Sequence, residues 1–163
     1  MSEQLEVKLG KLLRERGWTI AVAETTTGGV ISARIVSVPG SSAYYERGVI
    51  AYSALSKREM LGIDEKVMDT YGAVSAEAAC AMAKGVQEVS GADLGLAETG
   101  IAGPIRGRSP KPIGTAYIAV AGVEGVVCEV FQFDGDRDAI RNAIADAALK
   151  MVIEAKKQLI TDN

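Results

Sequence analysis

The chain has 163 residues, of which 48% are hydrophobic and 24% are charged, and these values are typical of one globular domain with a substantial core. Its formal net charge of −3 argues against a surface that binds nucleic acid. The polar N-terminus and the lack of a long apolar run argue against a signal peptide or a membrane span. We therefore expect one soluble, cytoplasmic domain over residues 1–163, without a membrane or nucleic-acid partner.

The residue types that are missing restrict the chemistry. The sequence has no histidine, which excludes Ser-His-Asp and Cys-His catalysis and histidine-ligated zinc. A proton acceptor must therefore be a carboxylate, a lysine, a tyrosine or water. The two cysteines, Cys80 and Cys128, form no C-x-x-C pattern, and we expect free thiols buried as small apolar residues. No P-loop, dinucleotide fingerprint or clustered metal-ligand pattern occurs.

Apolar periodicity and turn residues predict alternating helices and strands. In chain order we expect a helix over 5–16, a strand over 18–22, a helix over 30–36, a strand over 48–52, helices over 54–61, 65–71 and 76–90, strands over 94–98, 114–120 and 126–133, and a helix over 137–159. Residues placed to cap these helices are Gly17, Ser53, Asp64, Ser75, Gly91 and 134–136. The last two strands lie at hairpin distance and should be antiparallel. The whole pattern predicts a three-layer α/β/α domain with a five-stranded, mostly parallel mixed sheet.

The stretch 23–29, with the sequence A-E-T-T-T-G-G, forms the turn between the first strand and the second helix. In open α/β sheets ligands bind outside the carboxyl ends of strands, where glycines let the backbone approach and free helix N–H groups attract anions. We therefore expect the site at this turn. Thr25, Thr26 and Thr27 are candidate nucleophiles, ligand donors or simple helix caps. Lys57 is a candidate base if it is buried, and otherwise an ordinary solvated helix lysine.

Two groups of cations are candidates for binding an anion. The loop over 99–112 carries three glycines, three prolines and the cations Arg106, Arg108 and Lys111, a composition that suits a phosphate but also an ordinary surface loop. Arg137 and Arg141 are four residues apart on the last helix and share a face. They could hold one carboxylate or phosphate between them, or pair with neighbouring aspartates.

Taken together, these residues resemble the competence-damage-inducible protein family, specifically its C-terminal CinA domain, which also occurs alone as nicotinamide mononucleotide deamidase (PncC). The matching motifs are A-E-T-T-T-G-G at 23–29, V-P-G-S-S-A-Y-Y-E-R-G at 38–48, Y-S at 52–53 with Lys57, G-A-V-S at 72–75, T-G-I-A-G-P at 99–104, K-P-I-G-T at 111–115 and G-D-R-D-A-I-R at 135–141. They cover nearly the whole chain in collinear order.

The resemblance implies a three-layer α/β/α fold and hydrolysis of nicotinamide mononucleotide to nicotinate mononucleotide and ammonia, without a metal or organic cofactor. It implies a small-molecule nucleotide as substrate and a homo-oligomer. Family members resemble serine-lysine amidohydrolases, whose nucleophile corresponds to Thr25 and whose base corresponds to Lys57. Tyr52 would orient that base or flank the pyridine ring. The substrate-binding positions implied are Glu24, Thr26, Thr27, Gly28, Gly29, Thr99, Gly100, Ala102, Gly103, Arg137 and Arg141.

The chain departs from the family pattern in two places. Thr25 stands where the family has serine, and its β-methyl restricts the rotamer and crowds the attacked carbonyl. The segment 105–110 replaces a glycine-rich, acidic segment and adds positive charge. Two further hypotheses therefore stand beside the deamidase: a nucleotide-binding module without hydrolysis, and a hydrolase of a different phosphorylated amide.

Overall fold

The computed structural model describes residues 2–159, with side chains for residues 2–155. The elements are α1 (Leu5–Arg16), β1 (Ile20–Glu24), α2 (Val30–Val36), the short 3₁₀ helix η1 (Ser41–Ala43), β2 (Tyr45–Ile50), α3 (Ala54–Leu61), α4 (Glu65–Tyr71), α5 (Ala76–Ser90), β3 (Leu94–Gly100), β4 (Thr115–Gly122), β5 (Gly125–Gln132) and α6 (Arg137–Leu159). Every helix and strand expected from the sequence is present in this order.

The five strands form one mixed sheet with the order β2-β1-β3-β4-β5. β1 pairs in parallel with β2 and with β3, whereas β4 is antiparallel to both of its neighbours. Four strands therefore run in one direction, and β4 alone runs in the opposite direction. Of the four pairs of neighbouring strands, two are parallel and two are antiparallel. The β4–β5 hairpin confirms the expected antiparallel pair. The carboxyl ends of β1, β2 and β3 meet at one edge of the sheet, and this edge carries the site described below.

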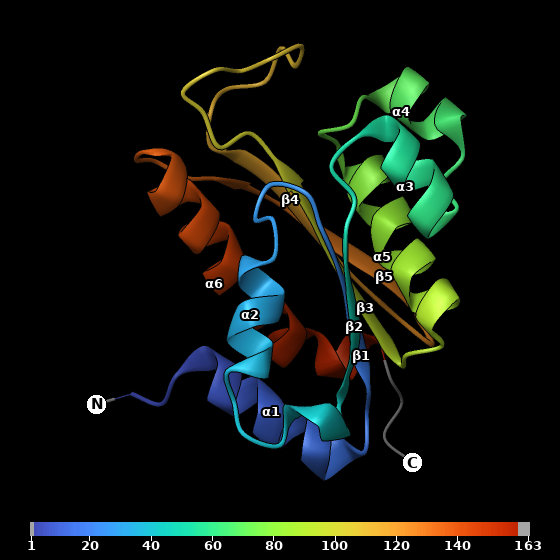
Figure 1. Ribbon diagram of the computed structural model, residues 1–163, viewed down its shortest axis with the longest axis vertical. Helices are drawn as coiled ribbons and strands as arrows, with labels where there is room; N and C mark the ends of the chain where they lie inside the picture. Colours follow the sequence, from blue (N-terminus) through green and yellow to red (C-terminus); the bar gives the residue numbers. More distant parts are fainter. Residues whose placement is uncertain (1, 160–163) are drawn as a thin grey trace.

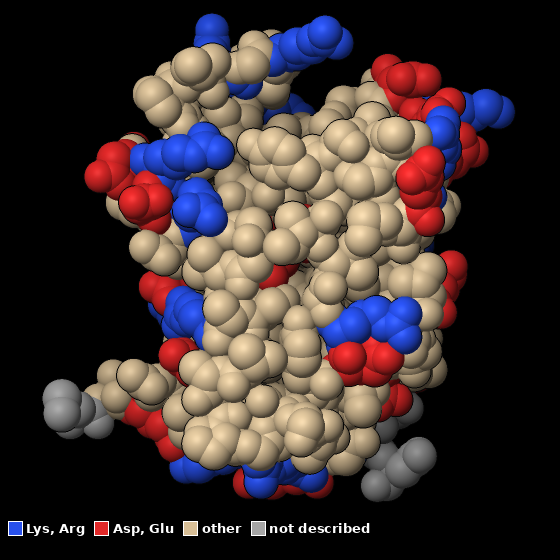
Figure 2. All heavy atoms as spheres, viewed as in Figure 1, with Lys and Arg blue, Asp and Glu red and all other residues tan. Residues whose placement is uncertain are grey.

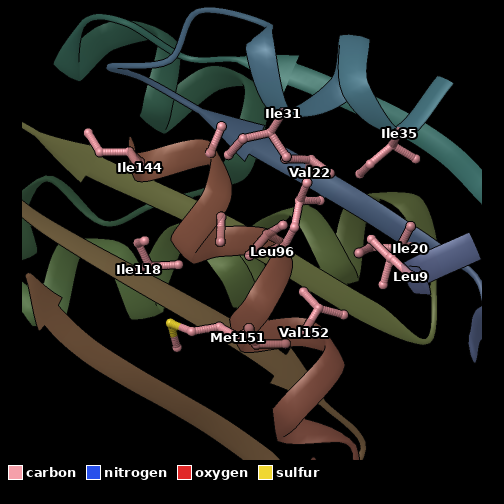
Figure 3. Close-up of a cluster of buried hydrophobic side chains, with 14 of the residues drawn as sticks. Leu9, Ile20, Val22, Ile31, Ile35, Leu96, Ile118, Ile144, Met151 and Val152 are labelled. Carbon is pink, nitrogen blue, oxygen red and sulfur yellow. The ribbon is translucent and has the colours of Figure 1, made fainter. Parts of the chain in front are cut away.

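Helices cover both faces of the sheet, which confirms the three-layer architecture (Figure 1). α1, α2 and α6 pack on one face over a cluster that includes Leu9, Val22, Ile31, Leu96, Ile118 and Ile144 (Figure 3). α3, α4 and α5 pack on the other face over a second cluster, which includes Ala23, Leu61, Met82, Val86 and Ala119. The alanines and glycines of this second layer let α5 approach the strands closely.

Side chains and glycines that the sequence marked as caps begin and end the helices. The Ser53, Asp64 and Ser75 side chains accept hydrogen bonds from the main-chain N–H groups of α3, α4 and α5. Gly17 and Gly91 end α1 and α5 in the left-handed conformation, with φ of 67° and 72°. The capping predictions are therefore confirmed. α6 is the longest helix with 23 residues, but within residues 2–159 no helix is both long and apolar enough to cross a membrane.

All five strands differ from their expected bounds by one to three residues at one or both ends, and the differences in β2 and β3 have a clear cause. β2 begins at Tyr45 and ends at Ile50, whereas the sequence predicted a strand over 48–52. β2 is an edge strand with an exposed face, so its polar residues 45–47 pair with β1 through the main chain without forming an apolar run. β3 extends to Gly100, two residues beyond the expected end, because Thr99 and Gly100 pair with β4.

Both cysteines are free and only partly buried, so the expectation of free thiols is confirmed and that of full burial is wrong. Cys80 of α5 and Cys128 of β5 interact, and a hydrogen bond from Cys128 lowers the pKa of the Cys80 thiol to about 7. The same interaction raises the pKa of Cys128.

Candidate active site

A cavity of about 560 Å³ opens at the edge of the sheet where β1, β2 and β3 end. One wall comes from residues 25–26 after β1 and from Tyr52 and Lys57 after β2. The other wall comes from the loop between β3 and β4, and residues 71–74 between α4 and α5 close the end. Figure 2 shows the molecule hollowed between this loop and α4. Parallel strands bring three segments that are distant in sequence to one place.

Thr25 lies at the cavity wall with its main chain and hydroxyl both fixed. Its N–H donates a hydrogen bond of 2.7 Å to Oε1 of Glu98. Its hydroxyl donates to the main-chain carbonyl of Ala51 at 3.0 Å, and Sδ of Met82 is 3.9 Å from the same Oγ1. The hydroxyl oxygen keeps free lone pairs, so it can attack an electrophile once a base removes its proton.

Lys57 lines the same cavity and is only 2% exposed. The Ser53–Ser56 capping box begins α3 immediately before it and so places Lys57 in the first turns of the helix. Burial lowers the pKa of the Lys57 ammonium below its ordinary value, and the charge of Glu98 opposes this shift. The interpretation as a solvated helix lysine is therefore wrong. The structure brings a hydroxyl and a buried amine into one cavity.

Glu98 is a buried carboxylate beside this pair, and the sequence analysis missed it. Its Oε1 accepts hydrogen bonds from the N–H groups of Thr25 and Thr27, at 2.7 and 2.9 Å. Its Oε2 is buried without a hydrogen-bond partner among the described residues. Burial raises the pKa of Glu98 above its ordinary value, although the hydrogen bonds from Thr27 and Thr25 oppose the shift. The available signal was a carboxylate inside an otherwise apolar strand, which requires a specific partner.

The N-terminus of α2, where the sequence predicted an anion site, is occupied by a carboxylate of the chain itself. Glu24 accepts hydrogen bonds from the N–H groups of Gly29, Ile31 and Ser32, at 3.1, 2.9 and 3.0 Å. These three N–H groups are therefore not free to attract an anion from a ligand, as the sequence analysis expected of this turn. Gly28 and Gly29 form the turn with φ of 58° and 109°, a region that favours glycine.

The two threonines that follow Thr25 have different surroundings. Thr26 lines the cavity, and its hydroxyl donates to the carbonyl of Gly100 at 3.1 Å. Thr27 is fully buried, and its hydroxyl lies 2.5 Å from Oε1 of Glu24 and 2.9 Å from Oε1 of Glu98. Thr27 therefore joins two carboxyl groups below the cavity and does not line it.

Five cations and no aspartate or glutamate are among the described residues that line the cavity. The cations are Lys57, Arg106, Arg108, Lys111 and Arg137. Figure 2 shows basic atoms gathered at the top of the molecule, where Figure 1 draws the loop between β3 and β4 in yellow. The whole chain has a net charge of −3, so the charge of the cavity lining is opposite in sign to that of the protein as a whole. A positively charged lining suits an anionic ligand.

Arg137 and Arg141 hold the main chain at two different places. Arg137 lines the cavity and donates to the carbonyl of Gly103 at 2.8 Å. Arg141 donates to the carbonyls of Thr26 and Thr27 at 3.1 and 2.8 Å and lies outside the lining. Arg141 therefore supports the turn after β1. Lys111 is likewise engaged, because it donates to the carbonyl of Val74 and lies 4.9 Å from the ring centre of Tyr117.

Of the residues predicted for the site, nine line the cavity: Thr25, Thr26, Tyr52, Lys57, Thr99, Gly100, Ala102, Gly103 and Arg137. The other five, Glu24, Thr27, Gly28, Gly29 and Arg141, lie outside its lining and build the turn below it. Tyr71 was missed, and it adds a second aromatic ring to Tyr52, the two being 53% and 66% exposed. Among the described residues, no group of three or more cysteine, aspartate or glutamate side chains could hold a metal ion.

Known proteins are similar to this chain in sequence or in fold. The family described as CinA C-terminal domain matches residues 2–156. A CinA-like protein of Geotalea uraniireducens is 40% identical over 98% of the chain, and one of Geobacter sp. M21 is 49% identical over 85%. The chain spans only 39% and 34% of the length of these curated relatives.

Solved structures agree over almost their whole length. A competence-damaged protein (CinA) superfamily protein from Klebsiella pneumoniae superimposes with a TM-score of 0.91 at 28% identity, over 94% of this chain and 96% of its own. The competence/damage inducible protein CihA from Agrobacterium tumefaciens gives 0.85 at 35% identity, over 94% and 98%. This chain therefore belongs to the CinA C-terminal domain family.

Proposed function

We propose that the protein is an amidohydrolase that converts nicotinamide mononucleotide and water to nicotinate mononucleotide and ammonia. The observation that carries this proposal is the presence in one cavity of the Thr25 hydroxyl and the buried Lys57 amine, whose pKa burial lowers from its ordinary value. In a protein without histidine, a lysine that loses its proton readily is a suitable base for a hydroxyl nucleophile.

In the first step the neutral Lys57 amine removes the proton of Thr25 Oγ1, and the oxygen forms a bond to the carboxamide carbon. The main-chain N–H of Thr26 stabilises the negative oxygen of the tetrahedral intermediate. The N–H groups of Thr25 and Thr27 are not available for this task, since both donate to Glu98. The Lys57 ammonium then gives its proton to the amide nitrogen, which leaves as ammonia.

In the second step water hydrolyses the ester formed on Thr25. Lys57, again neutral, takes a proton from the water as its oxygen attacks the ester carbon. The proton returns to Thr25 Oγ1 as the C–O bond to the threonine breaks, and nicotinate mononucleotide is released. The enzyme is thereby restored, and one water is consumed for each ammonia formed.

The rest of the cavity suits the remaining parts of such a substrate. Tyr52 and Tyr71 present exposed rings against which a pyridine ring can stack. Arg106 and Arg108 are exposed lining residues of the loop between β3 and β4 and can attract the 5′-phosphate. A hydrolase of a different phosphorylated amide would use the same parts, and its substrate would differ in the group that contacts this loop.

A nucleotide-binding module without hydrolysis is the second candidate, and one contact favours it. The Thr25 hydroxyl donates its proton to the Ala51 carbonyl, so the proton must rotate away before Lys57 can take it. The β-branched side chain also restricts χ1 more than in a serine, which limits how far Oγ1 itself can move toward Lys57.

The decisive experiment measures ammonia and nicotinate mononucleotide released from nicotinamide mononucleotide by the wild-type protein and by Thr25→Ser, Thr25→Ala and Lys57→Ala. We expect turnover by wild type and by Thr25→Ser, and a loss of about 1,000-fold or more in the two alanine variants. Lys8→Ala, on the exposed face of α1, is the control and should match wild type. Saturable binding without ammonia release would favour the binding module, and undiminished turnover by Lys57→Ala would exclude the proposed mechanism.

A further inference from the structure

Glu98 accepts a hydrogen bond from the main chain of the proposed nucleophile, yet the proposed reaction does not use it. It is fully buried near the end of β3, and its Oε1 holds two main-chain N–H groups on either side of Thr26. A carboxylate that accepts the N–H of Thr25 at 2.7 Å fixes the main chain of the proposed nucleophile. Its second oxygen has no partner among the described residues and so keeps its lone pairs for a proton or an ammonium group.

The charged groups around Glu98 come from three elements. Lys57 of α3 lines the same cavity as Thr25, whose N–H Glu98 accepts, and the charge of Glu98 raises the pKa of the Lys57 ammonium against the effect of burial. Glu24, at the end of β1, shares the Thr27 hydroxyl with it, at 2.5 and 2.9 Å. Arg141 of α6 holds the carbonyls of Thr26 and Thr27 in the same turn. One hydroxyl proton cannot satisfy two negative carboxylates, so the neighbouring Glu24 favours the neutral form of Glu98, whereas Lys57 favours its charged form.

We propose that Glu98 is a positioning residue of the Thr25–Lys57 pair: its carboxyl holds the nucleophile's main chain, and its charge sets how readily Lys57 gives up its proton. The proposal rests on the proposed function for its catalytic meaning. When Glu98 is negative it stabilises the Lys57 ammonium. When Glu98 is protonated, that stabilisation is lost, and Lys57 becomes the neutral amine that can accept the Thr25 proton at a lower pH than it otherwise would.

The variant Glu98→Gln separates these two roles. The glutamine keeps the length of the side chain and a carbonyl oxygen that can accept the Thr25 and Thr27 N–H groups, but it has no charge. Without the negative charge, Lys57 should lose its proton about one pH unit lower than in wild type. The acid limb of the pH profile of kcat/KM for ammonia release should move down by the same amount, with KM little changed.

A second readout is independent of turnover. The rate at which a small amine-reactive reagent such as cyanate modifies Lys57, followed by mass spectrometry across pH, reports the neutral fraction of this one amine. The pH at which half of the Lys57 amine is neutral is its midpoint. We expect the Lys57 midpoint to be lower in Glu98→Gln than in wild type. Glu98→Asp, which keeps the charge but shortens the reach to Thr25, should keep a midpoint near the wild-type value and lose kcat.

Asp93→Asn is the matched control. Asp93 precedes the same strand at its opposite end, and its Oδ2 also accepts a main-chain N–H and a threonine hydroxyl, both from Thr19, at 2.8 and 3.1 Å. This change should leave the Lys57 midpoint and the pH profile unchanged.

An unmoved or raised Lys57 midpoint in Glu98→Gln would overturn the proposal, whatever the activity. If Glu98→Gln does not fold, Glu98→Asp decides, because a midpoint about one unit lower in that charged variant would contradict the assigned role. A lowered midpoint in Glu98→Gln together with no ammonia release from any protein would support the electrostatic role and reject the amidase. Ammonia release together with an unmoved Lys57 midpoint would support the amidase and reject the electrostatic role of Glu98.

Discussion

The main-chain N–H groups at the start of α2 donate hydrogen bonds to a side chain of the protein itself, so they are not free to bind a ligand. Glu24, which is itself fully buried, accepts three of them and also contacts the Thr27 hydroxyl. A charged acceptor at a helix N-terminus interacts favourably with the helix dipole as well. Glu24 therefore acts as an internal cap that holds the turn carrying Thr25.

Removing this cap should cost stability. Glu24→Ala leaves buried N–H groups without acceptors, so we expect the free energy of unfolding to fall by about 3 kcal/mol or more. Glu24→Gln keeps one acceptor oxygen and should lose roughly half as much. Urea denaturation measures both, with Glu129→Ala on the exposed face of β5 as the control. Equal stability of Glu24→Ala and the control would show that the turn does not depend on this carboxylate.

At the scale of elements, the distance between α5 and the sheet depends on a glycine of β3. A Cβ at Gly95 would lie 2.1 Å from the carbonyl oxygen of Ala83 and 2.9 Å from Cβ of Gln87. Neither contact can be relieved by rotating a flexible side chain. Met82 of the same helix lies 3.9 Å from the Thr25 hydroxyl, so a shift of α5 reaches the cavity.

Gly95→Ala should therefore lower the free energy of unfolding by about 2 to 3 kcal/mol and reduce turnover as well. Thermal or urea unfolding checks the first effect, and ammonia release checks the second. The control Glu88→Ala, exposed on α5, should change stability by no more than about 0.5 kcal/mol. Wild-type stability of Gly95→Ala would mean that α5 can move outward without cost.

Elements with local signals could be predicted from the sequence, and contacts between them could not. Ser53 and Gly17 cap helices through nearby main-chain groups, and the sequence therefore located those helix ends. The start of β2 depends on pairing with β1 instead, which no local pattern records.

The candidate site likewise has one part that the local sequence predicts and another part that depends on contacts between distant segments. The turn at 23–29 was recognisable from its residues, but the placement of Thr25 and Lys57 in one cavity follows from the adjacency of β1 and β2 in the sheet. Glu98 was missed because its partners, the N–H groups of Thr25 and Thr27, are 73 and 71 residues away along the chain.

At the scale of the whole molecule, charge is distributed unevenly. The chain is acidic overall, yet the described lining of the cavity contains cations and no acid. Electrostatic attraction to such a lining raises the local concentration of an anionic substrate, and salt screens it.

We expect the double variant Arg106→Glu/Arg108→Glu to raise KM for nicotinamide mononucleotide about 10-fold at low salt, with a smaller change in kcat. The increase should shrink at high salt, and the phosphate-free nucleoside should show little of it. Steady-state kinetics at two salt concentrations measure this. The double variant Lys8→Glu/Lys11→Glu, an equal charge change on the exposed face of α1, is the control. The same KM increase for nucleoside and nucleotide would show that the arginines do not contact the phosphate.

The loop between β3 and β4 is closed at its base by two main-chain hydrogen bonds, from Ile101 to the Thr115 carbonyl at 2.9 Å and from Gly114 to the Ile101 carbonyl at 2.7 Å. Because main-chain groups make this closure and the side chains of residues 104–108 are exposed, these five residues form a cassette whose side chains can change without disturbing the strands on either side. Thr25, Lys57 and Glu98 all lie outside the cassette. Exchanging it between relatives would therefore transfer ligand preference while the chemistry stays in place, which offers a simple route by which one scaffold acquires new substrates.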